Sequence, residues 1–293
     1  MENNPSAIKN ILVTGANGQL GREFRQIEKK FSSYKFYFVA KEELLITDED
    51  AVNIFFKNNP IDVCINCAAY TAVDKAETEK EQAMAVNATA VCYLAKACKI
   101  NNTKFIHIST DYVFNGTATK PYLENQETDP VNFYGQTKLS GEQNAFKENE
   151  ETIIIRTAWV YSSFGNNFVK TMLRLMKDRE SIGVVDDQFG CPTYAADLAD
   201  AIMQIIQSNN FIAGIYHYSN KGKISWYDFA KEVSLQVNSS CIVNGISTKE
   251  FPTPAARPSY SVLDTTKIAE TFNIIIPDWK DSLKKCLDIL QLK

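Results

Sequence analysis

Short apolar runs alternate with longer, helix-like stretches in the first half of the chain. The runs are rich in branched and aromatic residues and predict five strands: Asn10–Thr14, Lys35–Ala40, Val63–Asn66, Lys104–Ser109 and Thr152–Arg156. The stretches between them predict helices: Leu20–Lys30, Asp48–Asn58, Glu79–Lys99 and Tyr134–Lys147. Alternation at this spacing is typical of βαβ units, which form a parallel sheet with right-handed crossovers and helices on both faces.

This rhythm breaks down after about residue 160, where prolines punctuate loops at Pro192, Pro252, Pro254 and Pro258. Helical patterns persist at Thr193–Gln207 and Trp226–Gln236. We therefore predict an α/β protein with a Rossmann-type doubly wound parallel sheet in residues 1–160. Residues 161–293 should form a smaller, mixed α/β substrate-binding lobe that is interleaved with the first domain.

Composition narrows the function classes only slightly. The chain has 293 residues, 45% of them hydrophobic, and a net charge of -4, so nothing marks it as a nucleic-acid-binding protein. No apolar run is long enough to span a membrane. The polar segment Met1–Ala7 lacks the apolar core of a signal peptide and reads as a disordered lead-in. We expect a cytoplasmic protein.

The seven cysteines are expected to be reduced thiols. Cys64 and Cys67 form a CxxC motif, but they lie in an apolar predicted strand, where residues three apart face opposite sides. Buried packing is therefore favoured over redox chemistry. His107 and His217 are the only histidines, with no zinc-ligand spacing, and His107 is expected to be a core residue.

A glycine motif, GxxGxxG, joins the first predicted strand to the first predicted helix at Gly15, Gly18 and Gly21. A tight turn and close approach to a diphosphate both require residues without a Cβ, and the helix N-terminus offers free amides. The strand–loop–helix context favours dinucleotide binding over an ordinary turn.

The residues after the second predicted strand bear on the choice of nicotinamide cofactor. An acid there would bind the ribose hydroxyl of NAD, but this strand ends in Val39-Ala40-Lys41. A cation suits the additional phosphate of NADP, so Lys41 favours NADPH without excluding NADH, and Arg22 is a second candidate cation. A solvated loop lysine remains the alternative for Lys41.

Three YxxxK pairs occur in the chain, and only one has a suitable context. Tyr134 and Lys138 lie at the start of a predicted helix, where a spacing of four places both on one face. Thr110 ends the fourth predicted strand, at the sheet edge where ligands bind in doubly wound proteins. The pair Tyr227/Lys231 has no such partner.

These three residues suit the reduction of a ketone. Tyr134 can supply the proton, and the Lys138 ammonium and the cationic nicotinamide of the oxidised cofactor are expected to lower the tyrosine pKa. Lys138 can also hold the nicotinamide ribose. Thr110 can hydrogen-bond the carbonyl oxygen and orient it.

Longer motifs connect the chain to a known family. They are GANGQLG (15–21), NCAAYTAVDKAE (66–77), STDYVFNG (109–116), YGQTKLSGE (134–142), RTAWVY (156–161), GNNFVKTM (165–172), DDQFGCPT (186–193) and ARPSYSVLD (256–264). With them the sequence closely resembles the dTDP-4-dehydrorhamnose reductases of the extended short-chain dehydrogenase/reductase superfamily. The resemblance implies NADPH-dependent reduction of dTDP-4-dehydro-β-L-rhamnose to dTDP-L-rhamnose, the last step of dTDP-rhamnose synthesis for polysaccharides.

The resemblance also implies roles for individual residues. The catalytic residues would be Thr110, Tyr134 and Lys138. Cofactor contacts would come from Gly15, Gly18, Gln19, Leu20, Gly21, Lys41, Ala68, Ala69 and Tyr70 together with Tyr134 and Lys138. The sugar nucleotide would lie near Val73, Asp74, Thr110, Asp111, Trp159 and Arg257.

Three of these assignments stay open from the residues alone. Trp159 could pack on a sugar or base, or it could be a core residue. Arg257 could pair with a phosphate, or it could be a solvated loop arginine. Some family members are described as homodimers bridged by a metal through surface carboxylates. Glu23 sits where one such acid would lie, so a magnesium site is undecided.

Two alternative functions compete with the reductase. The first is a nucleotide-sugar dehydratase or epimerase with the same fold. Related dehydratases carry Asp-Glu after the strand-end threonine, but here Asp111 and Tyr112 follow Thr110, with no glutamate for eliminating water. A cofactor-binding regulatory subunit has the same fold, and the intact set of Thr110, Tyr134 and Lys138 argues against it.

Overall fold

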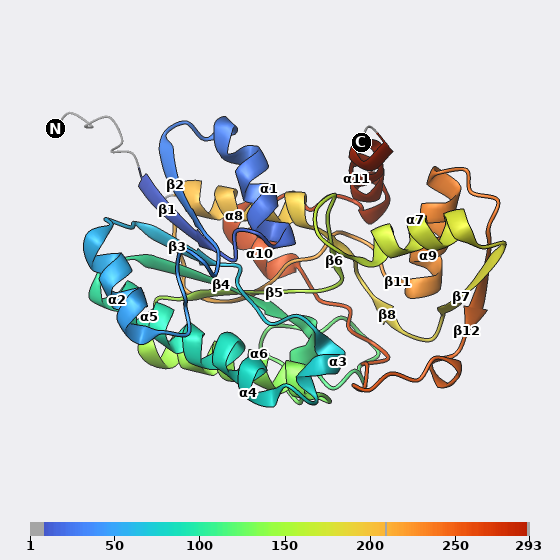
Figure 1. Ribbon diagram of the computed structural model, residues 1–293, viewed down its shortest axis with the longest axis horizontal. Coiled ribbons are helices and arrows are strands. Elements are labelled where there is room, and N and C mark those ends of the chain that lie inside the picture. The colour runs from blue at the N-terminus through green and yellow to red at the C-terminus, as the bar shows by residue number, and fades with distance from the viewer. Residues whose placement is uncertain (1–8, 209, 292–293) are drawn as a thin grey trace.

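The computed structural model describes residues 9–208 and 210–291 of the chain, so the expected lead-in at Met1–Ala7 lies outside the described residues. Six parallel strands form the central sheet in the order β10-β5-β4-β3-β1-β2 (Figure 1). Their bounds are β1 Lys9–Thr14, β2 Tyr34–Val39, β3 Val63–Asn66, β4 Lys104–Thr110, β5 Ile153–Thr157 and β10 Gly214–His217. The predicted doubly wound parallel sheet is confirmed.

Helices cover both faces of this sheet, as Figure 1 shows. On one face lie α1 Gln19–Ile27, α8 Ala195–Gln207 and α10 Thr266–Phe272. On the other lie α2 Glu49–Asn58, α5 Ala90–Ile100 and α6 Phe133–Glu148. Alternation along β1 explains the two layers, because Ile11 and Val13 pack towards α1 and α8 whereas Leu12 packs towards α2 and α5.

The remaining elements form a smaller lobe beside the carboxyl ends of the strands (Figure 1). Its helices are α7 Phe168–Asp178, α9 Trp226–Gln236 and α11 Trp279–Gln291. Three short strand pairs accompany them: β7 Ser181–Val185 with β12 Ile242–Ile246, β6 Val160–Tyr161 with β9 Thr193–Tyr194, and β8 Phe189–Gly190 with β11 Ile224–Ser225. Between β9 and β11 the chain returns to the main sheet through α8 and β10. Segments of the second half therefore pack on the first half. A domain boundary at residue 160 stays a prediction.

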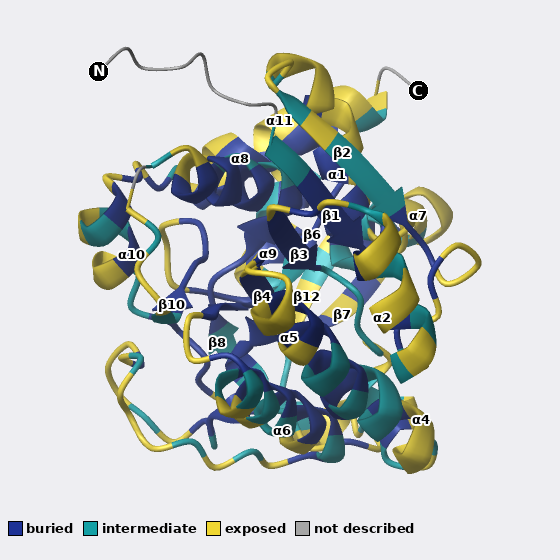
Figure 2. Ribbon diagram, turned by 90° about the vertical axis from the view of Figure 1, so that its left-hand side faces the viewer, coloured by how far each residue is buried: buried dark blue, intermediate teal, exposed yellow. Residues whose placement is uncertain are grey.

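The strand order creates a crevice at the cofactor end of the sheet. After β1 the chain moves outward to β2, and it then returns past β1 to β3, so the connections leave in opposite directions between β1 and β3. Ligands of doubly wound sheets bind at such a switch point, outside the carboxyl ends of the strands. The glycine loop follows β1 here, and Cys67-Ala68-Ala69 follows β3. The strands beneath are buried (Figure 2).

The predicted ranges of the five sequence strands agree with the structure to within a residue at each end. The helix predicted at Glu79–Lys99 consists of α4 Lys80–Met84, a π-helical turn at Ala85–Thr89 and α5. A further short helix, α3, spans Val73–Ala76. Cys64 and Cys67 pack into different cores on opposite faces of the sheet, as predicted. Within the described ranges, every helix is too short or too polar to cross a bilayer.

Candidate active site

The glycine loop is shaped for close approach by a ligand. Gly15 has a φ of +64°, and a Cβ there would lie 2.6 Å from the amide nitrogen of Ala68, so only glycine fits. At Gly21 a Cβ would lie 2.6 Å from the Cα of Ala16, which shows how tightly α1 packs on the loop. Gly18 caps α1 without a side-chain hydrogen bond, and the first turn holds no acid. The helix therefore presents free amides and its positive end to an anion.

A cavity of about 700 Å³ opens above this loop at the switch point. It is lined by ten of the eleven predicted cofactor residues: Gly15, Gly18, Gln19, Leu20, Lys41, Ala68, Ala69, Tyr70, Tyr134 and Lys138. Of the predicted cofactor residues only Gly21 is absent from this lining, because it packs against the loop instead. The shape and donors fit a dinucleotide.

The far end of the cavity carries Lys41, exposed after β2. Two acids follow directly, Glu42 and Glu43, and the Glu43 carboxylate accepts a hydrogen bond from the Ala40 amide at 2.7 Å. The carboxylate is thus engaged with its own loop. Leu45 and Thr47 also line this end. Lys41 is the cation that faces the cavity here.

The π-helical turn supports the loop that follows β3. Asn87 lies in this turn and is fully buried; its side chain accepts from the Tyr70 amide at 2.8 Å and donates to the Tyr70 carbonyl at 3.0 Å. It also donates to the Thr137 hydroxyl at 3.0 Å. Asn87 therefore ties the cofactor loop to the helix that carries Tyr134. Our sequence analysis missed this residue.

The start of α6 is fixed against the end of β4. Asn132 caps the helix by accepting from the Gly135 amide at 2.8 Å, and a Cβ at Gly135 would overlap the Tyr112 carbonyl. This close packing brings Tyr134 to Thr110, with which its hydroxyl forms a hydrogen bond. The predicted trio is therefore assembled, with Thr110, Tyr134 and Lys138 each at most 8% exposed.

Burial shifts the pKa values of Tyr134 and Lys138. It raises the pKa of Tyr134 to about 12, against the lowering effect of the Thr110 hydrogen bond. It lowers the pKa of Lys138 to about 8, against the raising effect of Glu142. In the protein without cofactor, desolvation of the tyrosinate dominates, so the expected lowering of the tyrosine pKa by Lys138 and the oxidised nicotinamide stays a prediction. Tyr134 is thus a protonated acid at neutral pH.

Lys138 is held from the strand side. Its ammonium nitrogen donates to the Ile108 carbonyl at 2.7 Å and lies 3.4 Å from Nε2 of His107. His107 is fully buried, as predicted, but its contact with the lysine could not be seen in the sequence.

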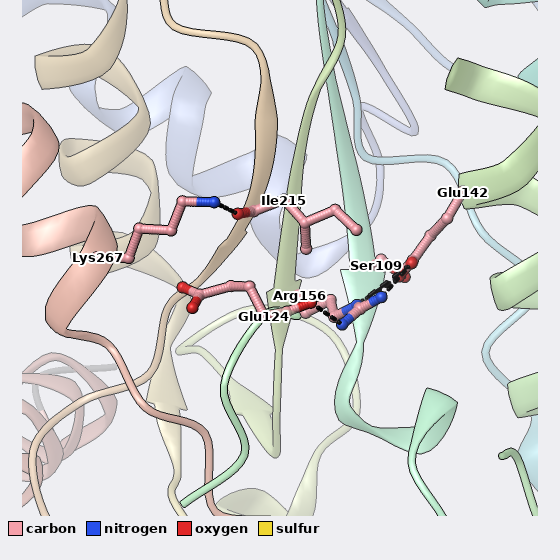
Figure 3. Close-up of polar contacts among 6 residues, drawn as sticks. All are labelled: Ser109, Glu124, Glu142, Arg156, Ile215 and Lys267. Carbon is pink, nitrogen blue, oxygen red and sulfur yellow. Dashed lines mark hydrogen bonds and ion pairs between the residues drawn. The ribbon is translucent and has the colours of Figure 1, made fainter. Parts of the chain in front are cut away.

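One turn beyond Lys138, a buried ion pair anchors α6 to the sheet (Figure 3). Glu142 accepts from two guanidinium nitrogens of Arg156, at 2.9 and 2.7 Å, and from the Ser109 hydroxyl at 2.5 Å. Ser109 and Arg156 are register partners on β4 and β5. Residues of both strands therefore donate hydrogen bonds to the Glu142 carboxylate, which fixes the position of α6, the helix that carries Tyr134 and Lys138.

Asp111 follows Thr110 and is 1% exposed. One carboxylate oxygen accepts from the Thr110 hydroxyl at 3.0 Å, and the Ser261 hydroxyl also hydrogen-bonds the carboxylate. Burial raises the Asp111 pKa to about 6. Asp111 therefore orients the Thr110 hydroxyl.

The other predicted substrate residues lie on elements around this centre. Arg257 and Asp74 form an ion pair at 2.9 Å, and the Arg257 side chain is only 17% exposed, so it is not a solvated loop arginine. Val73 begins α3 beside Asp74. The Trp159 indole stacks on Trp226 with ring centres 3.5 Å apart, at a φ of +48°. Trp159 therefore packs into the smaller lobe.

Glu23 differs from the expectation of a surface carboxylate. Its side chain is 3% exposed and accepts from the Ser162 hydroxyl at 2.5 Å, since α1 packs against the segment after β6. Across residues 9–208 and 210–291, no group of three or more His, Cys, Asp or Glu side chains is arranged to hold a metal ion.

Comparisons with known proteins show the family of the chain. The family model for the RmlD substrate binding domain matches residues 9–292. A dTDP-4-dehydrorhamnose reductase from Aggregatibacter actinomycetemcomitans is 42% identical over 94% of this chain and 97% of its own. The crystal structure of a dTDP-4-dehydrorhamnose reductase from Clostridium acetobutylicum has a TM-score of 0.92 at 43% identity, covering 96% and 99% of the two chains. Another, from Bacillus anthracis in complex with NADP, has a TM-score of 0.91 at 38% identity over 96% and 99%. The chain therefore belongs to the dTDP-4-dehydrorhamnose reductase family.

Proposed function

We propose that this protein uses NADPH to reduce the 4-keto group of dTDP-4-dehydro-β-L-rhamnose, giving dTDP-L-rhamnose. The observation that carries the proposal is the Tyr134/Lys138 pair on the wall of the dinucleotide-shaped cavity, with Thr110 bonded to the tyrosine. The relatives' names supply the identity of the sugar nucleotide.

The residues of the cavity fit the cofactor at both ends. The uncapped amides at the start of α1 would take the diphosphate, and Gly18 leaves room for it. Lys41 would pair with the additional phosphate of NADPH, while Lys138 would hold the nicotinamide ribose. When bound, NADPH supplies the hydride.

The protein's own contribution to the reaction is proton donation and orientation. Tyr134 is protonated at neutral pH and buried, so its hydroxyl can give a proton to the oxygen that becomes the alcohol. Thr110 would hydrogen-bond the same oxygen and fix its direction, with Asp111 orienting the threonine hydroxyl. The lysine charge would then balance the tyrosinate.

Residues outside the lining of the cofactor cavity would bind the sugar nucleotide. Arg257 carries a positive charge on a loop that Asn132 holds by donating to the Ala256 carbonyl at 2.8 Å, directly beside the start of α6. That position suits a contact with the substrate diphosphate. Val73, Asp74, Asp111 and Trp159 belong to the same proposal, although the packing of Trp159 on Trp226 gives it a structural role as well.

The test is an NADPH oxidation assay with purified protein and dTDP-4-dehydro-β-L-rhamnose. Substrate-dependent loss of NADPH absorbance, with dTDP-L-rhamnose as product, supports the proposal. A protein that binds NADPH but leaves the 4-keto sugar unchanged would instead be a cofactor-binding subunit. A parallel assay with NADH measures the cofactor preference.

We also propose that the protein forms a homodimer and works in the cytoplasm. Support for the location comes from the seven cysteines, which are all free thiols, as is usual in a reducing compartment. Two-fold dimers are the commonest soluble oligomers. Light scattering coupled to size-exclusion chromatography tests the dimer, with and without added magnesium.

A further inference from the structure

A buried row of polar side chains crosses the sheet and ends at Lys138. Thr14, Asn66 and His107 are register partners on β1, β3 and β4, so their side chains lie on one face. The Thr14 hydroxyl donates to Oδ1 of Asn66 at 2.6 Å, and Nδ2 of Asn66 lies 3.0 Å from Nδ1 of His107. Nε2 of His107 then faces the lysine nitrogen at 3.4 Å.

This row fixes the tautomer of His107. Oδ1 of Asn66 accepts from the Thr14 hydroxyl and from the Ala68 amide, at 2.6 and 3.2 Å, so the amide group of the side chain must turn its NH₂ to the imidazole. An NH₂ group only donates, and Nδ1 of His107 must therefore accept. Burial keeps the His107 pKa well below its ordinary value, so the ring is neutral and its proton is on Nε2.

The two charge states of Lys138 meet this N–H differently. A neutral amine has a lone pair that can accept from it, whereas an ammonium group offers only donors to a donor. We propose that His107 is a positioning residue for Lys138, donating from Nε2–H to the lysine nitrogen and so favouring the neutral amine. This inference rests on the proposed function, in which Lys138 acts beside the cofactor and Tyr134.

Other groups around Lys138 oppose or assist His107. On α6, Glu142 favours the ammonium form, but Arg156 on β5 pairs with that carboxylate. On β4, the Ile108 carbonyl accepts from the lysine at 2.7 Å. The thiol of Cys67, after β3, is neutral because burial raises its pKa. Tyr134, one turn earlier on α6, is also neutral, since burial raises its pKa to about 12.

Together these effects give Lys138 a pKa of about 8, so it is close to half-protonated at mildly alkaline pH. A lysine in that position exists in both forms at mildly alkaline pH, and His107 contributes to where the change occurs. The residue would therefore affect the pH at which Lys138 can balance the charge of a tyrosinate.

The tautomer can be measured directly in the cofactor-free protein by ¹⁵N-histidine NMR. The chain has two histidines, and His217 is the internal control. Nδ1 of His217 lies 3.0 Å from the Tyr122 carbonyl oxygen, which can only accept, so the proton there is on Nδ1. We expect opposite tautomers for the two rings. A proton on Nδ1 of His107, or titration of that ring between about pH 5 and 8, overturns the inference.

The effect on Lys138 is measured by titrating ¹³C-labelled lysine, with Lys138→Met assigning the signal. In His107→Gln the amide can turn its oxygen to the lysine, which favours the ammonium, so the Lys138 pKa should rise by about one unit. His217 is equally buried but is hydrogen-bonded to the Tyr122 carbonyl, so His217→Gln should leave the Lys138 pKa unchanged.

An unchanged or lower Lys138 pKa in folded His107→Gln contradicts the proposal. If that variant does not fold, the tautomer of the wild-type ring decides. Neither measurement needs NADPH or the sugar nucleotide, so failure of the proposed reduction and failure of this inference are separate results.

Discussion

A carboxylate oxygen of Asp74 lies 2.9 Å from a guanidinium nitrogen of Arg257, so two residues expected to bind the substrate bind each other. The same oxygen accepts from the Ala255 amide at 3.1 Å. These contacts link α3 to the proline-bounded loop that follows β12, beside the start of α6. The pair holds the arginine in position next to the catalytic centre.

Replacing this arginine tests its role towards the sugar nucleotide. Arg257→Gln removes a charge-assisted hydrogen bond to the substrate diphosphate, so KM for the sugar nucleotide should rise about 10- to 100-fold. NADPH affinity should stay unchanged, because the residue lies outside the cofactor cavity lining. Steady-state kinetics and NADPH fluorescence titration separate the two effects. An unchanged KM would remove Arg257 from the substrate site.

The glycine loop offers a matched pair of variants. A Cβ at Gly18 would meet only the Gly15 carbonyl oxygen, at 3.2 Å, so the protein itself should tolerate a side chain there. Gly18→Val should therefore fold but lose at least about tenfold in NADPH affinity, because the side chain fills the diphosphate position.

Gly21→Ala is the comparison, since its Cβ would lie 2.6 Å from both the Ala16 Cα and the Gly15 carbonyl oxygen. This variant should lose folding stability, by about 1–3 kcal/mol in urea unfolding. If Gly18→Val folds normally and binds NADPH like the wild type, the cofactor does not use this loop.

Stability should depend on pH through Asp111. Burial raises its pKa from 3.8 to about 6 in the folded protein. A carboxyl group whose pKa is higher in the folded than in the unfolded protein favours folding while it is protonated. The contribution of Asp111 to the free energy of unfolding is therefore complete below pH 3.8 and is lost as the pH rises through about 6. Asp111→Asn does not titrate, and its stability relative to wild type should improve by about 2–3 kcal/mol between pH 4 and pH 7. A constant difference in urea midpoints would show that folding does not raise the Asp111 pKa.

The ion pair between Glu142 and Arg156 predicts a non-additive double mutant. Glu142→Met leaves a buried guanidinium without its counterion, which should cost about 3–5 kcal/mol of unfolding free energy. Replacing both residues with methionine removes both charges and should recover most of this loss. Urea unfolding of the two variants and of Arg156→Met gives the coupling energy. Additive losses would mean that the pair is not coupled in solution.

The sequence predicted the main sheet because its strands are apolar runs whose signal is local. The exception was β10, Gly214–His217, which joins the sheet beside β5 but begins with a glycine and ends with a histidine, so it has no continuous apolar run. The two-residue strands of the smaller lobe also exist only through their partners. The π-helical turn inside the predicted helix Glu79–Lys99 depends on another element too, because the Asn87 carbonyl packs against the Cβ-free face of Gly141.

The candidate site divides in the same way. The glycine loop and the Tyr134/Lys138 pair were predictable because their spacing along the chain reports their geometry. Asn87 and Glu142 were missed because their partners come from distant segments. One signal was available for the ion pair: Arg156 ends the apolar run Ile153–Ile155, where a buried charge needs an opposite charge nearby.

The central claim is that Tyr134 donates the proton in a reduction by NADPH, and Tyr134→Phe tests it most directly. The variant loses only a hydroxyl, so folding and NADPH affinity should persist while kcat with dTDP-4-dehydro-β-L-rhamnose falls about 10²- to 10⁴-fold. Tyr227→Phe is the control, because that tyrosine lies on α9 with its own Lys231 and away from the cavity lining. The account predicts a large loss for Tyr134→Phe and near wild-type turnover for Tyr227→Phe. Normal turnover in folded Tyr134→Phe would contradict it.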